Sequence, residues 1–220
     1  AASHNSVLRP LYRARTAGTS LSVLPVAPDG SIDADAFEAL FRPETRLVVA
    51  THASNVTGDV YDVARLARIS HEHGALFCLD AAQTAGVLPV RMGGMGLDLV
   101  AFTGHKGLYG PQGTGGLAVA EGVDVPPLLE GGSGTHSFDE RHPRFMPEAL
   151  EAGTLNAHGL AGLAAGVAYL ERTGVDDVAA RLRALTGRFE AGAAAMPGVR
   201  VLGGHGGIDR CAIVAVDVAG

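Results

Sequence analysis

The sequence predicts an α/β fold in three layers, with a mostly parallel sheet between helices and the start of a smaller α+β unit. In the first 120 residues, apolar runs of strand length alternate with helical patterns of about 10–15 residues, as in βαβ units. Two long amphipathic patterns and two further apolar runs follow. Hydrophobic residues make up 47% and charged residues 18% of the 220 residues, which is enough apolar material for a folded core.

The elements of the first half follow from local pattern. Strands are expected at apolar runs, namely residues 20–26, 47–50, 75–79, 97–102 and 116–120. Helices are expected at 33–41, capped by Asp33, and at 61–73, ended by Gly74. Apolar runs without alternation are typical of strands buried on both faces, so the sheet is expected to be mostly parallel.

The second half has a different character. Residues 123–144 are rich in Gly, Pro, Ser and His and predict a long irregular segment. Helices are expected at 158–171 and 175–195, followed by strands at 199–202 and 211–218. We therefore expect a large domain over residues 1–155, and connecting helices with the start of a small domain over 156–220.

Composition excludes several classes of function. A net charge of -6 argues against a nucleic-acid-binding surface. No apolar run reaches the roughly 18 residues that a membrane span requires, and the first ten residues lack the pattern of a signal peptide. Cys78 and Cys211 lie inside apolar runs without the spacing of metal ligands, which predicts packed thiols in a reducing cytoplasm. His71 and His73 would not face the same side of a helix, so no metal site is expected.

Lysine usage singles out one residue. The chain has 17 basic residues, and Lys106 is the only one of them that is not arginine. A guanidinium stays protonated in proteins, whereas an amine can lose its proton and attack a carbonyl. Lys106 is therefore a candidate for covalent amine chemistry, and the alternative is that codon bias left one lysine by chance.

Two candidate residues follow expected strands. Asp80 comes directly after 75–79, and Lys106 lies a few residues past 97–102. Ligands of parallel α/β sheets bind beyond the carboxyl ends of the strands, where both residues are expected. Gln83 is expected to face the same ligand from the start of a helix. A purely structural role for Asp80, as the N-cap of that helix, stays open.

Thr103 and His105 lie within four residues of Lys106, in a stretch with six glycines between residues 104 and 116. Hydroxyl and imidazole groups suit a phosphate, and glycines allow close approach of the backbone. The stretch also holds a dinucleotide-like Gly pattern at 113–118, which we reject because it leads into a strand rather than a helix. An amine, a carboxylate and a phosphate-binding group together fit pyridoxal 5'-phosphate.

Four blocks of sequence carry a resemblance to a known family. They are HASNVTG at 52–58, DAAQTAG at 80–86, TGHKGLYGP at 103–111 and EAGTLN at 151–156. In this order they resemble the class V aminotransferase group of fold-type I pyridoxal-phosphate enzymes, and within it the cysteine desulfurases. The resemblance covers nearly the whole chain and implies the large domain of a PLP-dependent transferase.

The resemblance implies a role for each candidate at the expected sheet edge. Lys106 would form the Schiff base with the cofactor and later move the α-proton of the substrate. Asp80 would pair with the pyridine nitrogen, and Gln83 would bind the phenolic oxygen. The cofactor phosphate would be held by Thr103 and His105.

Three further residues take roles from the family alone. Asn55 would lie near the phenolic oxygen and the substrate carboxylate. His4 would stack on the cofactor ring and assist proton transfer, and His52 is interpreted as structural. Thr154 would reach the phosphate in the partner subunit, which implies a homodimer. The turn at 131–134 is expected to border the site.

The implied activity is cysteine desulfuration, in which L-cysteine becomes L-alanine and sulfur passes to an enzyme persulfide and then to an acceptor protein. Another class V reaction (transamination, selenocysteine cleavage or epimerisation) and an inactive fragment are the alternatives, because a fold does not determine a reaction. Family members begin before Ala1 and continue past Gly220, and neither cysteine of this chain matches their nucleophile. We therefore expect the central fragment of a longer enzyme.

Overall fold

A four-stranded sheet forms the centre of the chain. The computed structural model describes residues 2–27, 29–204 and 209–219. Strands β1 (Leu47–Thr51), β2 (Leu76–Asp80) and β3 (Leu99–Thr103) run parallel, and β4 (Gly115–Val119) pairs antiparallel with β3, in the order β1-β2-β3-β4. The prediction of an α/β fold with a mostly parallel sheet is confirmed.

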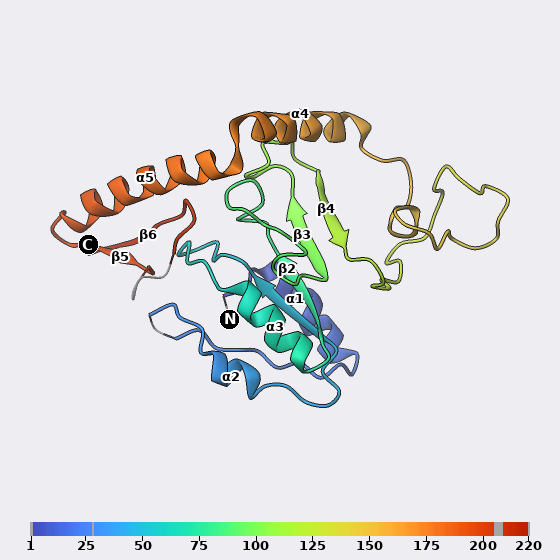
Figure 1. The fold of residues 1–220 in the computed structure, drawn as a ribbon, viewed down its shortest axis with the longest axis horizontal. Coiled ribbons are helices and arrows are strands. Elements are labelled where there is room, and N and C mark those ends of the chain that lie inside the picture. The colour runs from blue at the N-terminus through green and yellow to red at the C-terminus, as the bar shows by residue number, and fades with distance from the viewer. Residues whose placement is uncertain (1, 28, 205–208, 220) are drawn as a thin grey trace.

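Three helices gather around β1 and β2 (Figure 1). They are α1 (Asn5–Thr16), α2 (Ala34–Glu38) and α3 (Val63–Glu72). The Asp62 carboxylate caps α3 by accepting the Arg65 N–H, and Gly74 ends the helix with a φ of 72°. The apolar face of α3 packs on β2, where Phe77 and Leu79 are fully buried. This contact forms the centre of the hydrophobic core and fixes the position of β2 within the sheet.

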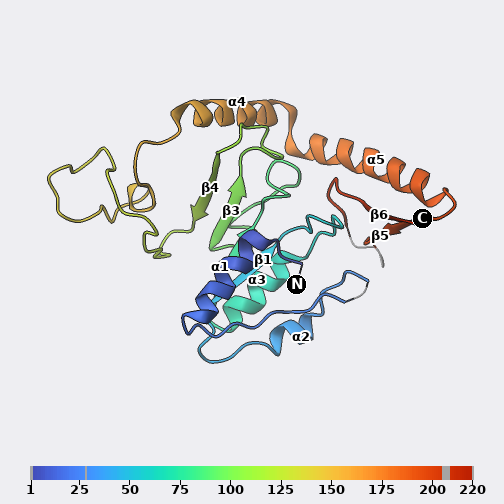
Figure 2. The ribbon, with the colours of Figure 1, turned by 180° about the vertical axis from the view of Figure 1, so that it is seen from behind.

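The second half extends away from this core. The 120–156 segment carries one short element, the 3₁₀ helix η1 (Glu148–Leu150), and it projects as an arm (Figures 1 and 2). Helix α4 (Ala157–Thr173) lies across one end of β3 and β4, and α5 (Val175–Ala194) leads to an antiparallel pair, β5 (Val199–Leu202) and β6 (Ala215–Val218). The predicted irregular segment and both helices are confirmed, whereas β6 begins four residues later than expected.

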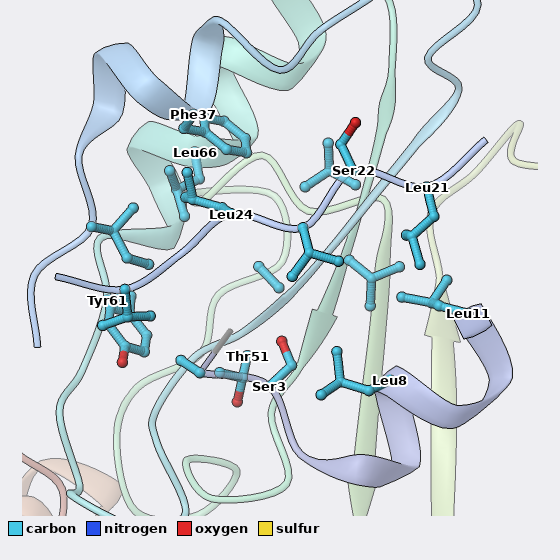
Figure 3. Close-up of a pocket in the computed structure, with 17 residues that line it drawn as sticks. Ser3, Leu8, Leu11, Leu21, Ser22, Leu24, Phe37, Thr51, Tyr61 and Leu66 are labelled. Atoms are coloured by element: carbon cyan, nitrogen blue, oxygen red, sulfur yellow. The ribbon is translucent and has the colours of Figure 1, made fainter. Parts of the chain in front are cut away.

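The strand expected at residues 20–26 is wrong. These residues, all of which the structure describes, form no strand and no helix. They pass alongside β1 with an apolar cavity of about 110 Å³ between them, lined by Leu21, Leu24 and Phe37 among others (Figure 3). A strand requires a hydrogen-bonded neighbour, and here that cavity separates the segment from β1.

Helix α1 was not expected from the sequence. None of its residues is buried, and it contains Pro10, a residue that usually interrupts a helix. Its N-cap is His4, whose Nδ1 accepts the Ser6 N–H at 3.2 Å and lies 2.9 Å from the Ser6 hydroxyl. An imidazole cap is not one of the usual signals of a helix start, which is why the pattern was missed.

Candidate functional site

The carboxyl ends of three parallel strands form one edge of the sheet. Thr51 of β1 pairs in register with Asp80 of β2, and Asp80 pairs with Ala101, two residues before Thr103 at the end of β3. The segments that follow these strands, including the loop with Lys106, therefore leave the sheet at the same edge. This is the edge at which parallel α/β sheets bind ligands.

The segment after Asp80 is a turn. Thr84 and Ala85 both donate their N–H groups to the Ala81 carbonyl, and Gly86 adopts a φ of 77°, which stops helical winding. The expected helix start at Gln83 is therefore wrong, and Gln83 lies half-buried inside the turn. The half-buried Asp80 caps this turn, since its Oδ1 accepts the Ala82 N–H at 3.0 Å. That bond uses one of its two carboxylate oxygens.

The loop with Lys106 closes on itself. Gly104 donates its N–H to the Thr114 carbonyl and accepts the N–H of Gly110, and Tyr109 donates to the Lys106 carbonyl. The Lys106 side chain is exposed. At the base of the loop, the Thr103 hydroxyl and His105 Nδ1 lie 2.7 Å apart. A hydroxyl and an imidazole are thus held together, and Lys106 is the next residue in the chain.

Two glycines bring the Asp80 turn against the Lys106 loop. A methyl group at Gly86 would lie 2.2 Å from the Gly107 carbonyl oxygen, and one at Gly107 would lie 2.5 Å from the Ala85 carbonyl oxygen. The two backbones therefore touch, one residue from Lys106. The sequence predicted that glycines here allow approach of a ligand, whereas these two allow the approach of one backbone to another.

Asn55 lies in a tight loop directly after β1. The Ser54 hydroxyl oxygen accepts the N–H groups of Val56 and Thr57, and the Ser54 carbonyl accepts the Gly58 N–H. A bridge between Ala53 and Val60 closes the loop. The half-buried Asn55 is thereby held at the same edge of the sheet as the end of β1.

His52 joins this loop to the Asp80 turn. It is buried, and its Nδ1 lies 2.9 Å from the hydroxyl of Thr84, which is also fully buried. Burial lowers the pKa of His52 to about 4, so the ring is neutral at pH 7. These contacts agree with the structural interpretation of His52, and they add Thr84, which the sequence did not single out.

The low pKa of His52 predicts a loss of stability in mild acid. Between its ordinary pKa of 6.5 and about 4, the unfolded chain binds a proton that the folded chain excludes. The free energy of unfolding is therefore unaffected by this group above pH 6.5. It decreases as the pH falls toward 4, by about 3 kcal/mol at most. Urea unfolding at several pH values should give a shallower pH slope for His52→Asn than for the unmodified chain. Equal slopes would contradict the prediction.

His4 lies near the same edge of the sheet. The residue before it, Ser3, lines one cavity together with Thr51, the last residue of β1 (Figure 3). The His4 ring itself is exposed and caps α1. The chain thus brings the residue next to His4 to the end of β1 from a segment far away in sequence.

Thr154 lies elsewhere, on the exposed segment between η1 and α4. The neighbouring Gly153 donates its N–H to the Gly132 carbonyl, which places Thr154 beside the 131–134 turn with Ser133. In the part of the chain that the structure describes, no hydrogen bond or ion pair joins Thr154 to Asp80 or Lys106. Thr154 and this turn thus lie next to each other on the 120–156 segment.

The two cysteines are thiols with raised pKa values. Cys78 and Cys211 are free thiols. Burial, with a smaller contribution from Asp80, raises the pKa of Cys78 to about 11, and burial likewise raises the pKa of Cys211 to about 11. Neither thiol is a ready nucleophile. Across residues 2–27, 29–204 and 209–219, no cluster of three metal-ligating side chains and no helix able to cross a membrane is found.

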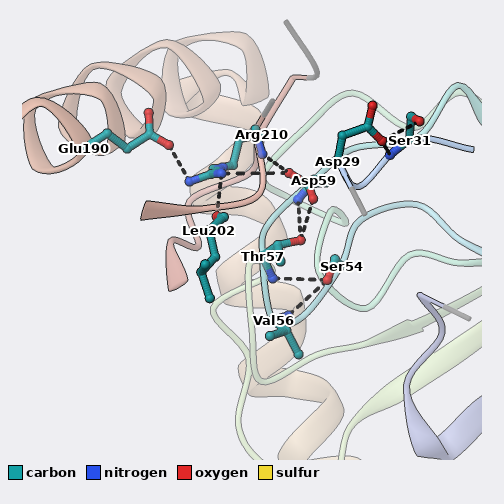
Figure 4. A network of polar contacts seen from close by, with 10 residues as sticks. Asp29, Ser31, Ser54, Val56, Thr57, Asp59, Glu190, Leu202 and Arg210 are labelled. Atoms are coloured by element: carbon teal, nitrogen blue, oxygen red, sulfur yellow. Dashed lines mark hydrogen bonds and ion pairs between the residues drawn. The ribbon is translucent and has the colours of Figure 1, made fainter. Parts of the chain in front are cut away.

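A buried charge cluster was missed entirely. Arg210 pairs with Asp59 and with Glu190, and the three residues come from distant segments of the chain (Figure 4). Local sequence contains no signal for such a cluster, because its members are far apart in the chain. In the sequence, each of them looks like an ordinary charged residue of the surface. Only the packing of β5 and α5 against the loop assembles it.

Comparison with known proteins identifies the family. The profile described as Aminotransferase class-V matches residues 1–220. A probable cysteine desulfurase of Methanothermobacter thermautotrophicus is 35% identical over 204 residues, which make up 91% of this chain and 51% of that protein. A cysteine desulfurase of Escherichia coli is 34% identical over 206 residues, 91% of this chain and 50% of that protein. The chain thus spans about half the length of the curated relatives it matches.

Solved structures of cysteine desulfurases have the same architecture as this chain. The apo structure of a cysteine desulfurase from Thermococcus onnurineus NA1 superposes with a TM-score of 0.89 at 32% identity, covering 99% of this chain and 55% of that one. A cysteine desulfurase from Escherichia coli gives a TM-score of 0.90 at 32% identity and covers 100% of this chain and 55% of that one. The profile match, the identities and the shared architecture lead to one conclusion: the chain belongs to the class-V aminotransferase family.

Proposed function

We propose that this chain forms the cofactor-binding core of a pyridoxal-phosphate-dependent cysteine desulfurase. One observation carries the proposal: the Asp80 turn and the Lys106 loop leave the same sheet edge and touch through Gly86 and Gly107. The turn after the Asp80 carboxylate and the loop that carries the chain's only lysine are therefore in backbone contact. The cysteine desulfurases among its relatives suggest L-cysteine as the amino-acid substrate.

The residues present fit the cofactor. Pyridoxal phosphate, when bound, would act as an electron sink for the bond that breaks at the substrate's α-carbon. Lys106 would hold the cofactor through its amine and then carry the α-proton, and Asp80 would keep a proton on the pyridine nitrogen. Thr103 and His105, already 2.7 Å apart, offer a hydroxyl and an imidazole to the phosphate.

The remaining residues would orient the ring and the substrate. Gln83 and Asn55 carry amide groups that can donate to the phenolic oxygen, and both lie half-buried in turns that follow the sheet edge. His4, near the end of β1, would cover the ring face and assist proton transfer. We do not assign the sulfur-receiving role to Cys78 or Cys211, because burial raises the pKa of both thiols.

A titration tests the role of Asp80. We expect the chain to bind pyridoxal phosphate with a visible absorbance change, and Asp80→Asn to weaken binding roughly 10–100-fold, as the loss of a hydrogen bond to a charged group predicts. The matched control is Asp124→Asn, which changes an exposed carboxylate on the arm. Equal affinity for both variants would rule out the proposed pairing. Sulfide release from L-cysteine then distinguishes desulfuration from transamination.

We also propose that the protein is a homodimer with shared sites. The arm carries large apolar side chains that are exposed, among them Leu128, Leu129 and Phe138. Large apolar side chains exposed on one segment are a feature of association surfaces. Thr154 lies exposed at the base of the same arm, where it would reach the phosphate of a partner subunit. Light scattering should show a dimer. We further propose that sulfur passes from the enzyme to an acceptor protein. The free thiols support a cytoplasmic location.

A further inference from the structure

We propose that Asp59 is a positioning residue for Asn55: its buried carboxylate anchors the 53–60 loop to the β5–β6 unit and so sets where the Asn55 amide lies at the sheet edge. The inference rests on the proposed function, since it assigns the anchor a role in cofactor binding. Nothing in the four sequence blocks pointed to Asp59, which lies one residue after the first of them.

The Asp59 carboxylate is held from both sides. Its Oδ2 accepts the Thr57 hydroxyl at 2.6 Å, and its Oδ1 accepts the Gly204 N–H at 2.6 Å (Figure 4). Asp59 is 1% exposed, so these bonds are shielded from water. One bond is internal to the loop that carries Asn55, and the other reaches a residue 145 positions away. A single side chain thus connects the 53–60 loop to the β5–β6 unit.

Charge pairing supports this anchor. Arg210 Nη2 lies 3.9 Å from Asp59 Oδ1, Arg210 Nη1 donates to Glu190 Oε1 at 2.5 Å, and Arg210 Nη2 donates to the Leu202 carbonyl. The Arg210 side chain is 6% exposed. A buried guanidinium requires negative partners, and Asp59 and Glu190 supply them from the loop and from α5.

The backbone adds a second connection at the same place. The Val60 N–H donates to the Asp209 carbonyl, and the Cys211 N–H donates to the Gly58 carbonyl. Residues 58–60 are therefore hydrogen-bonded to the β5–β6 unit. Within the loop, a bridge joins Ala53 and Val60. Because Asn55 lies between Ser54 and this anchored stretch, any shift of Asp59 is transmitted to it over four residues.

Glycines make the fit close. A methyl group at Gly203 would lie 2.8 Å from Asp59 Oδ1, and one at Gly30 would lie 2.6 Å from Asp59 Oδ2. At Gly58, a methyl group would lie 2.1 Å from the Ile213 carbonyl oxygen. Three backbones thus surround the Asp59 carboxylate and its loop at contact distance. This packing argues for a specific location of the loop and against a surface turn that moves freely.

Hydrogen exchange tests the anchor without the cofactor. In Asp59→Ala we expect the amides of Gly58 and Val60 to exchange at least about tenfold faster, because the loop loses its attachment, while Phe77 and Leu79 in β2 stay protected. The control is Asp217→Asn, which removes the exposed 2.9 Å pair with Arg200 and leaves the loop untouched. If Asp59→Ala does not fold, Asp59→Asn replaces it, with faster exchange at the same two amides expected. Unchanged exchange would overturn the inference.

A double-mutant cycle on the loaded protein tests the positioning role. We expect Asn55→Ala and Asp59→Ala each to move the pH midpoint of the bound pyridoxal phosphate absorbance by about one pH unit, a tenfold change in proton affinity. If Asp59 acts through Asn55, the double variant has the midpoint of Asn55→Ala alone. Additive shifts, or a midpoint that Asp59→Ala leaves in place, would overturn the assignment.

The two proposals fail in different ways. If the unmodified chain does not bind pyridoxal phosphate, the proposed function is wrong, and the exchange experiment still reports whether Asp59 anchors the loop. If the unmodified chain binds the cofactor and Asp59→Ala behaves as Asp217→Asn does in both measurements, the proposed function stands and the positioning role of Asp59 is wrong.

Discussion

Lys106→Arg should lose the covalent cofactor completely. When the chain is mixed with pyridoxal phosphate and reduced with borohydride, the label should be fixed on the peptide that contains Lys106, and none should remain in the variant. A guanidinium stays protonated and cannot form the bond that the amine forms. Lys106 is exposed, so the substitution should leave the folded state unchanged. Mass spectrometry of the labelled peptides measures the result.

The matched control for this experiment places an amine elsewhere. Arg141→Lys adds a lysine at an exposed position on the arm. If the sheet edge selects the amine, this variant should still carry its label on Lys106. Label retained in Lys106→Arg, or distributed equally between the two lysines of the control, would contradict the assignment of Lys106.

Gly86→Ala should destabilise the fold and separate the two halves of the site. The new methyl group would meet the Gly107 carbonyl oxygen at 2.2 Å, and the φ of 77° already disfavours a side chain by about 1–2 kcal/mol. Relief of the contact requires the Asp80 turn and the Lys106 loop to move apart. We therefore expect a lower unfolding midpoint in urea and weaker binding of pyridoxal phosphate in the same variant.

Gly74→Ala separates the two causes. Gly74 has a similar φ of 72°, but a methyl group there would have nothing within 4 Å. This control should show the backbone cost of about 1–2 kcal/mol alone, with cofactor binding unchanged. The difference between the variants measures the contact of the two backbones. If both lose the same stability and bind the cofactor equally well, the Gly86–Gly107 contact does not hold the site together.

Strands and helices with strong local patterns were predictable because their own residues bury the surface that defines them. Strand β2 is one example, since the run around Phe77 and Leu79 is buried in the structure. Helix α3 is another, with a cap at Asp62 and a stop at Gly74. The strand expected at 20–26 and the missed α1 are the counterexamples. The first needs a bonded neighbour for its backbone, and the second has little buried surface.

The identity of the chemical groups was also predictable from sequence. Lys106 stands out because arginine occupies every other basic position, and Asp80 stands out because it follows an apolar run at the end of a strand. Residue type and distance from a strand end are local properties. They are sufficient to predict which groups lie at one edge of a parallel sheet, and together with the family blocks they indicate a cofactor.

The amino-acid sequence by itself therefore determined the kind of fold, the candidate groups and the sheet edge where they gather. Tertiary structure alone decided how the segments are held: the Gly86–Gly107 contact, the bond of His52 to Thr84, and the attachment of Asp59 to Gly204. The physical reason is that each of these contacts joins residues from segments distant in the chain. Local propensity carries no information about such pairs, because their free energy arises only when packing has excluded water between them.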